Sequence, residues 1–295
     1  MLTYRISAPD HVRRIESFLQ NLMPAAPPSY LRKLIKGRNV IINEQICTPG
    51  SILFLSDIVS LKETARTCAL ITSRCPAPDI LYEDDNIIIF NKPAGIPIHR
   101  SAEHGGENLM DRASLYLQSR DNLEIKLRPV NRLDKGTSGA VIAAKNSASA
   151  GAFGKLFQED LVKKCYLTLV IGTPPDQGLI DFTLDGKEAV TSFRTLFQGT
   201  EAALLAVYPL TGRTHQIRRH LSSINHPLIG DTRYGARKLK GFNNDALHAF
   251  KINFPDPFSM QEKEFHAPLA DKYLQNLSIL AGETFLSLIN SFIDL

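Results

Sequence analysis

Apolar positions in the first forty residues follow the period of an α-helix twice. Between His11 and Met23 they recur every three or four residues, which predicts a helix. A second helix is predicted from Tyr30 to Lys36, with Ser29 as its N-cap and Gly37 as its stop. Three short apolar runs then predict strands, at residues 40–42, 52–55 and 58–61. Two helices and a small sheet indicate a separate α/β unit, which we place at residues 1–64.

Beyond this unit, short strands and helices follow one another without a regular order. Residues 65–78 show no clear period and predict a linker. The strands predicted after it cover residues 87–90, 141–144, 166–171 and 203–208. The predicted helices cover residues 110–118, 148–159 and 214–224, with a terminal pair within 274–291. Because strands and helices do not alternate, the pattern favours an α+β domain over residues 79–295 rather than a doubly wound sheet.

Composition narrows the class of protein only modestly. The chain is 43% hydrophobic and 22% charged, which is ordinary for a folded protein, and its net charge is a mild +4. Its four cysteines form no Cys-x-x-Cys pair and have no zinc-site spacing, so we expect reduced thiols. The first residues lack the apolar core of a signal peptide, and no apolar run approaches a membrane span. These observations predict a cytoplasmic protein with no membrane partner and no metal.

The distribution of charge says more than its sum. Basic residues between positions 11 and 40 are Arg13, Arg14, Arg32, Lys33, Lys36 and Arg38, against the single acid Glu16. A second cluster comprises Arg213, His215, Arg218, Arg219 and His220. Basic patches on separate segments can line one anionic partner such as RNA. Either cluster alone is equally well explained as a solvated helix face.

The run from Val130 to Gly139 carries the most informative acid of the chain, Asp134. A Gly-Thr-Ser-Gly turn and an apolar stretch follow it, which predicts a loop that leads into a buried strand. A carboxylate at such a junction can be held by rigid neighbours and face a cleft, which suits a nucleophile. By itself, the same acid is better explained as a turn cap paired with Arg132.

Four further runs change that balance: residues 80–95, Lys164–Gly172, Leu210–Gly235 and Leu247–Ala249. With the Asp134 run, they resemble in order the motifs of the RluA family of RNA pseudouridine synthases, over about residues 78–270. One departure is Asn131, where the family usually has a histidine; we expect it to support the loop rather than take part in the chemistry. The N-terminal unit is similar to the RNA-binding domain of small-subunit ribosomal protein number four.

The resemblance implies a fold, a reaction and a set of residues. The fold is α+β, a mixed and largely antiparallel sheet with flanking helices and a central cleft. The reaction isomerises uridine to pseudouridine in RNA without a cofactor or a metal. The implied catalytic residues are the nucleophile Asp134, the aromatic Tyr166 and the cation Arg218.

The remaining residues are expected to bind RNA. Arg132 would fill the gap left by an extruded nucleotide, because taking a base out of the stack costs a few kcal/mol. The other pocket residues are expected to be Leu133, Lys164, Arg213, His215 and Ile217. In the N-terminal unit, Arg32, Lys33, Lys36 and Arg38 are expected to meet phosphates. We expect a monomer, and both large-subunit ribosomal RNA and tRNA stay open as substrates.

The same residues allow three other interpretations. His215 and His220 are five residues apart, which places them on different helix faces and disfavours a metal site. Ser138, His215 and Asp134 have the residue types of a hydrolase triad, but Ala140 stands where the nucleophile elbow needs glycine. An inactive synthase fold that only binds RNA is the non-enzymatic alternative, and retention of the three catalytic residue types argues against it.

Overall fold

The computed structural model describes residues 1–23, 26–72, 77–99, 108–121, 125–236 and 245–270. Contacts divide the chain into two units. The first consists of Met1–Pro78 and Pro97–Arg128, and the second of Asp79–Ile96 and Pro129–Leu295. Residues 97–128 thus group with the N-terminal unit, although the sequence pattern placed them in the second domain.

The first unit combines a small antiparallel sheet with short helices. Its sheet has the strand order β1-β6-β3-β4, and a separate ribbon pairs β2 with β5. Its strands are β1 (Leu2–Arg5), β2 (Arg13–Arg14), β3 (Val40–Ile42), β4 (Gln45–Ile46), β5 (Ile52–Leu53) and β6 (Ile58–Leu61). Its helices are η1 (Ala8–Asp10), α1 (Ile15–Leu22), α2 (Pro28–Lys36), α3 (Ala65–Thr72) and α4 (Leu109–Asp121).

The two predicted N-terminal helices are present with shifted starts. Helix α1 begins at Ile15 rather than His11, because the chain first pairs as β2. Helix α2 has Pro27 at its N-cap position with no side-chain cap, so the assignment of Ser29 as N-cap was wrong. Their apolar faces bury Phe18, Leu31 and other residues in one core, as their spacing predicts.

The segment predicted as a linker contains helix α3. Its start is closed by Thr64 and Thr67, whose side chains exchange hydrogen bonds with each other's backbone N–H groups at 2.7 and 3.0 Å. Leu70 and Ile71 pack against the core of the first unit. The segment expected to be a linker thus forms a helix over Ala65–Thr72.

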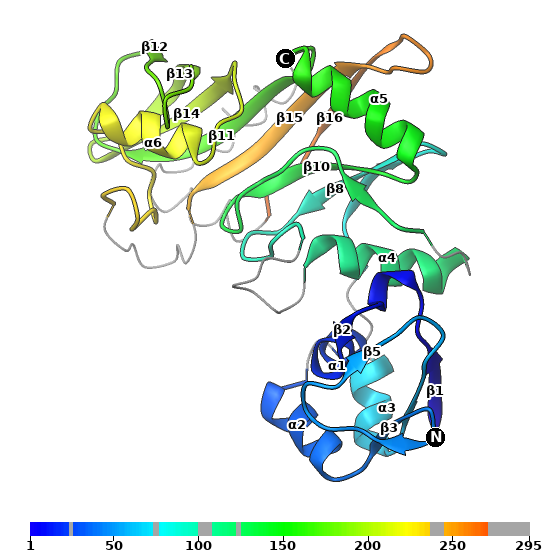
Figure 1. The fold of residues 1–295 in the computed structure, drawn as a ribbon. Coiled ribbons are helices and arrows are strands. Elements are labelled where there is room, and N and C mark those ends of the chain that lie inside the picture. The colour runs from blue at the N-terminus through cyan, green and yellow to red at the C-terminus, as the bar shows by residue number, and fades with distance from the viewer. Residues whose placement is uncertain (24–25, 73–76, 100–107, 122–124, 237–244, 271–295) are drawn as a thin grey trace. The chain divides into compact units, whose positions relative to one another are not determined.

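The second unit is built on a ten-stranded, mostly antiparallel sheet, as expected for the α+β class. The main strand order is β12-β13-β14-β11-β15-β10-β8-β7, with β16 beside β15 and β9 beside β10. Its strands are β7 (Ile80–Glu83), β8 (Ile87–Lys92), β9 (Arg128–Pro129), β10 (Ser138–Ala144), β11 (Lys163–Ile171), β12 (Gln177–Asp181), β13 (Val190–Gln198), β14 (Ala202–Pro209), β15 (Leu247–Pro255) and β16 (Glu262–His266). Its helices are α5 (Ser147–Gln158), which packs on β10, and α6 (Gln216–Ser223), which packs on β13 and β14 (Figure 1).

A parallel contact inside this sheet fixes the start of β10. Ser138 and Gly139 pair with His248 and Ala249 of β15, whereas the rest of β10 pairs antiparallel with β8. Gly139 has φ +108°, and a Cβ there would lie 2.3 Å from the carbonyl oxygen of Ala249. Only glycine fits at this position. The loop that carries Asp134 is thereby anchored directly against the centre of the sheet.

Four predictions concern the terminal helices, a membrane span, the oligomeric state and the location of the protein. The terminal helix pair within residues 274–291 lies outside the described residues. In the part of the chain that is described, no helix is both long enough and apolar enough to cross a membrane. The monomeric state and the cytoplasmic location stay predictions.

Candidate active site

A cavity of about 300 Å³ opens in the second unit between the Asp134 loop, β11 and the start of α6. It is lined by every residue that the sequence analysis assigned to catalysis or substrate binding in this unit. These residues are Arg132, Leu133, Asp134, Lys164, Tyr166, Arg213, His215, Ile217 and Arg218. Segments that are distant in the sequence therefore converge on one pocket, whose size suits a single base.

Asp134 projects from a tight turn at the wall of this cavity. The backbone N–H of Thr137 donates to the Asp134 carbonyl at 3.1 Å and closes the turn. Before the turn, Asn131 ties the loop to β10: its Oδ1 accepts from the backbone N–H of Ile142 at 2.8 Å, and its Nδ2 donates to the carbonyl of Ala140 at 3.3 Å. The asparagine thus braces the loop through two backbone contacts.

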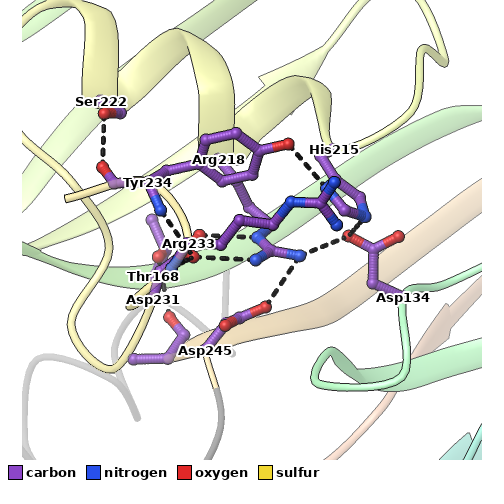
Figure 2. A network of polar contacts seen from close by, with 10 residues as sticks. Asp134, Thr168, His215, Arg218, Ser222, Asp231, Arg233, Tyr234 and Asp245 are labelled. Atoms are coloured by element: carbon purple, nitrogen blue, oxygen red, sulfur yellow. Dashed lines mark hydrogen bonds and ion pairs between the residues drawn. The ribbon is translucent and has the colours of Figure 1, made fainter. Parts of the chain in front are cut away.

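Arg218 is the centre of the polar network (Figure 2). The guanidinium binds Asp231 with two hydrogen bonds, of 2.6 Å from Nε and 2.8 Å from Nη2. Its Nη1 lies 3.2 Å from Asp134 Oδ2 and 3.2 Å from Asp245 Oδ2, and its plane lies 5.1 Å from the ring of Tyr234. A paired, planar cation is therefore presented to Asp134 in a fixed orientation.

The charges around Arg218 are unbalanced in favour of carboxylates. Although burial disfavours its charge, the hydrogen bonds of Asp231 and the charge of Asp245 raise the pKa of Arg218 above its ordinary value. Burial raises the pKa of Asp245 to about 6; Asp231 and Asp134 act in the same direction, and Arg218 opposes them. Asp245 therefore takes up a proton at a higher pH than an ordinary aspartate does.

A buried lysine adds a second cation behind the Asp134 loop. Lys92 is fully buried, and its Nζ donates to the carbonyls of Pro93 and Ile96 at 3.0 and 2.9 Å. Burial lowers the pKa of Lys92 to about 7, and the charge of Asp134 opposes this shift. The lysine holds the β8 loop under the carboxylate rather than facing the cavity.

The start of α6 is fixed by one glutamine. Gln216 Oε1 accepts from the Thr211 hydroxyl at 2.7 Å and from the Arg213 backbone N–H at 2.9 Å. Its Nε2 donates to Val190 and Thr191 on β13, at 3.0 and 2.9 Å. These bonds link the loop to the sheet. The next residues of α6, Ile217 and Arg218, are thereby held at the cavity wall.

Tyr166 reaches the cavity from a distortion of β11. The pairing of β11 with β15 shifts register between Cys165 and Tyr166, and such a bulge changes the direction of a side chain. Burial, with the nearby Asp134 charge, raises the pKa of Tyr166. The phenol is therefore neutral at physiological pH.

The remaining predicted residues differ in their exposure. Leu133 and Ile217 are buried, as expected for an apolar pocket wall. Arg132 and Arg213 are exposed, and the Nε of Arg213 donates to the Glu188 carbonyl at 2.8 Å. Lys164 is part-buried; burial lowers its pKa, and Asp160 opposes this.

The hydrolase-triad interpretation does not fit these contacts. The hydroxyl of Ser138 meets Nδ1 of His248 at 2.8 Å, not His215, and Nε2 of His248 meets the Ala267 carbonyl at 2.8 Å. Since a carbonyl only accepts, the proton of His248 is on Nε2, and the serine donates to Nδ1. The pair is a buried structural link between β10 and β15.

His248 makes the stability of the second unit sensitive to acid. Burial lowers its pKa to about 4, so its contribution is complete above the ordinary histidine pKa of about 6.5 and is lost as pH falls below it. We expect a loss of up to about 3 kcal/mol between pH 6.5 and pH 4 from this group. Urea unfolding measures the free energy of unfolding across this pH range. For His248→Gln this free energy should be lower at neutral pH than for the wild type, and it should change less steeply with pH. Equal slopes would show that His248 does not titrate in this way.

The metal interpretations also find no support. His215 contacts Tyr234 and Asp134, whereas His220 is buried against Thr191. The neighbouring acids Glu83, Asp84 and Asp85 lie at a turn, in which Asp84 accepts from two backbone N–H groups at 2.8 Å. Within the described ranges, no group of three possible ligands is arranged to hold a metal ion.

Three residues of the network were not assigned a role from the sequence. Asp231 and Tyr234 lie within the motif after His226, which pointed to the region but not to a function. Asp245 lies in no motif. Its closeness to the Asp134 loop is seen only in the structure. A Cβ added to Gly136 of that loop would lie 2.9 Å from the Asp245 carboxylate.

Comparisons with known proteins show which family the chain resembles. The family model described as RNA pseudouridylate synthase matches residues 86–223. The ribosomal large subunit pseudouridine synthase C of Buchnera aphidicola is 32% identical over 295 residues, covering 90% of this chain and 92% of that protein. The tRNA pseudouridine synthase C of Haemophilus ducreyi is 34% identical over 228 residues, covering 66% of this chain and 92% of that protein.

A solved structure supports the fold. Human RNA pseudouridylate synthase domain containing 4 aligns with a TM-score of 0.59 at 24% identity, covering 68% of this chain and 92% of that one. The fold is that of the pseudouridine synthases. The chain belongs to the RluA family of RNA pseudouridine synthases, and it is an isomerase that converts uridine to pseudouridine in RNA.

Proposed function

We propose that this enzyme isomerises specific uridines of large-subunit ribosomal RNA or of tRNA, with Asp134 as its nucleophile. The observation that supports this most strongly is the pairing of Asp134 with Arg218 at 3.2 Å in a cavity that Tyr166 also lines. A nucleophilic carboxylate must stay ionised in a partly closed pocket, and a buried guanidinium favours that form.

The reaction breaks one bond and forms another without net redox change. Asp134 attacks carbon 1′ of the extruded uridine, the bond from this carbon to the uracil nitrogen breaks, and the uracil turns within the cavity. Carbon 5 then bonds to carbon 1′ and displaces Asp134, whose bond to the sugar breaks. The proton of carbon 5 is lost, and the freed ring nitrogen takes up a proton. Leu133 and Ile217 hold the detached ring by apolar contact, which keeps it from diffusing away.

Tyr166 and Arg132 receive different parts in this proposal. Since the phenol of Tyr166 is neutral, its ring stacks on the uracil and its hydroxyl donates or relays a proton. Arg132 lies exposed at the edge of the cavity, where a long cation can occupy the space left by the extruded nucleotide. Lys164, Arg213 and His215 supply further donors to the nucleotide.

The names of the relatives leave two classes of RNA substrate, large-subunit ribosomal RNA and tRNA. Similar proteins are named as large-subunit ribosomal RNA enzymes and as tRNA enzymes. Mapping pseudouridines in total RNA with and without this protein distinguishes the two. Sites that disappear only from large-subunit ribosomal RNA assign the first class, and sites that disappear only from tRNA assign the second.

We further propose that the N-terminal unit binds RNA through the exposed basic side chains on and after α2. Arg32 is partly engaged by Glu16 at 3.1 Å, whereas Lys33, Lys36 and Arg38 are exposed. Arg13, by contrast, is buried in ion pairs with Asp10 and Asp111, which removes it from the predicted basic patch.

The combined variant Lys33→Gln, Lys36→Gln and Arg38→Gln is expected to weaken RNA binding and flatten its salt dependence. Removal of one cation that meets a phosphate lowers the log–log slope by roughly one. Turnover on saturating RNA should change little, because the cavity is untouched. Binding titrations at several salt concentrations measure this, with Lys155→Gln on α5 as the control for removal of an exposed lysine. An unchanged slope would show that these residues do not touch RNA.

A further inference from the structure

The two oxygens of Asp134 have different surroundings. Oδ2 is approached by Arg218 Nη1 at 3.2 Å and by His215 Nε2 at 3.6 Å. Among the described residues, no hydrogen bond or ion pair engages Oδ1. Oδ2 therefore bonds Arg218 and faces the His215 ring, and Oδ1 is left available for attack.

His215 is itself held in an uncommon conformation. It occupies the N-cap position of α6 with φ 54° and ψ 27°, in the left-handed region, and its side chain makes no capping bond. Its ring instead spans from Asp134 to Tyr234, whose hydroxyl oxygen lies 2.9 Å from Nδ1 (Figure 2). The backbone is strained so that the imidazole faces the carboxylate.

The contacts with Asp134 and Tyr234 together favour one position of the ring proton. Burial lowers the pKa of His215; Arg218 and Arg233 add to this, while Asp134 and Asp231 oppose it. In the neutral ring one nitrogen donates and the other accepts. A bare Nε2 would face the Asp134 carboxylate with its lone pair, so the favoured form has the proton on Nε2 and accepts at Nδ1 from the Tyr234 hydroxyl.

Tyr234 is held in a position where its hydroxyl can donate to Nδ1 and so stabilise this form. Its backbone N–H donates to Asp231 Oδ1 at 3.3 Å, and its carbonyl accepts from the Ser222 hydroxyl at 2.6 Å. Its ring lies against the guanidinium of Arg218, 5.1 Å from the centroid. Asp231 thus orients both the arginine and the tyrosine, and the contacts close into a ring that returns to Asp134.

We propose that Tyr234 is a positioning residue for the nucleophile: through the tautomer of His215 it holds Asp134 Oδ2 and leaves Oδ1 to attack. This inference rests on the proposed role of Asp134. In this proposal His215 lines the pocket and also positions Asp134. The Nε2–H group of His215 points at the Asp134 carboxylate.

Tyr234→Phe tests the proposal with little change of shape. The ring stays over Arg218, and only the hydroxyl is removed. We expect kcat to fall roughly tenfold, as for one hydrogen bond at the site, with KM for RNA within about twofold of wild type. Tyr82→Phe is the matched control. It removes a hydroxyl of the same unit that bonds Asp84 and Lys263, and it should leave kcat unchanged.

The tautomer of His215 is the second measurement. It would not change if Tyr234 had only a structural role. In ¹H–¹⁵N spectra of histidine-labelled protein, the signal missing from His215→Gln identifies His215. Wild type is expected to carry the proton on Nε2, and Tyr234→Phe to show a mixture of the two tautomers. A wild-type proton on Nδ1 overturns the proposal, as does a Tyr234→Phe protein with unchanged kcat or an unchanged tautomer.

Asp134→Asn separates this inference from the proposed function. If that variant retains turnover, the assignment of the nucleophile fails whatever the tautomer of His215. If it is inactive while Tyr234→Phe behaves as wild type, the nucleophile stands and the positioning role of Tyr234 fails.

Discussion

Replacement of Asp134 by asparagine is expected to abolish pseudouridine formation while RNA affinity stays within several-fold of wild type. The amide has the shape of the carboxylate and its oxygen can still accept from Arg218, so the cavity should keep its form. It cannot act as the nucleophile, because it carries no negative charge. The measurements are turnover on RNA and equilibrium binding, made on the same preparation.

The controls for this variant are direct. Mass spectrometry excludes deamidation back to aspartate. Asp185→Asn removes another carboxylate of the same unit, one that is exposed and paired with Arg219, and should leave turnover unchanged. Turnover of Asp134→Asn above a few per cent of wild type would remove Asp134 from the nucleophile's role.

The second large effect is expected at Arg218. Its side chain is only 8% exposed and serves Asp134, Asp231 and Asp245 together. Arg218→Ala leaves three neighbouring carboxylates without their shared cation, which favours their protonation or displacement. We expect turnover to be nearly abolished and the free energy of unfolding to fall by about 3 kcal/mol, as is typical when one partner of a buried ion pair is removed.

Arg218→Lys separates charge from geometry. Lysine keeps the charge but cannot make the two parallel hydrogen bonds to Asp231, so it should recover stability better than turnover. The neighbouring variant Arg219→Ala, which removes a pair with exposed Asp185, is the matched control for removal of an arginine from α6. A near-normal rate for Arg218→Ala at neutral pH would show that Arg218 does not support the nucleophile. Arg213, which lines the same cavity, should then be tested for that role.

Helices were predicted from the sequence better than strands. Helix α5 was expected at residues 148–159 and runs over Ser147–Gln158, because its apolar spacing is a local property. Strands β13 and β15 were not predicted. β15 lies between β10 and β11, which come from more than seventy residues earlier in the chain, and the polar Lys251 and Asn253 interrupt its apolar residues. Pairing with distant segments determines such a strand more than its own pattern does.

The N-terminal boundary shows another limit of the sequence. The apolar residues of segment 65–72 are mostly small and show no clear helical period, yet α3 forms where Leu70 and Ile71 reach the core. Likewise, nothing in residues 97–128 indicates that they group with the first unit. The ion pair between Arg13 and Asp111 joins positions almost one hundred residues apart.

All nine residues expected at the pocket line one cavity, together with other residues that were not predicted. The contacts that support this cavity were not predicted either. Asp231, Tyr234 and Asp245 act behind Arg218 and His215, through contacts between a helix and a loop. The spacing of residues in the sequence does not predict such contacts, so they are found only in the structure.

Release of label from carbon 5 of uridine in RNA measures the proposed reaction directly. Wild-type protein incubated with RNA that contains 5-tritiated uridine should release tritium and form pseudouridine in equal amounts, and Asp134→Asn should release none. Binding of RNA without any release by the wild-type protein, on RNA that contains its substrate sites, would contradict the proposed function and identify the protein as an inactive RNA-binding factor on the same fold.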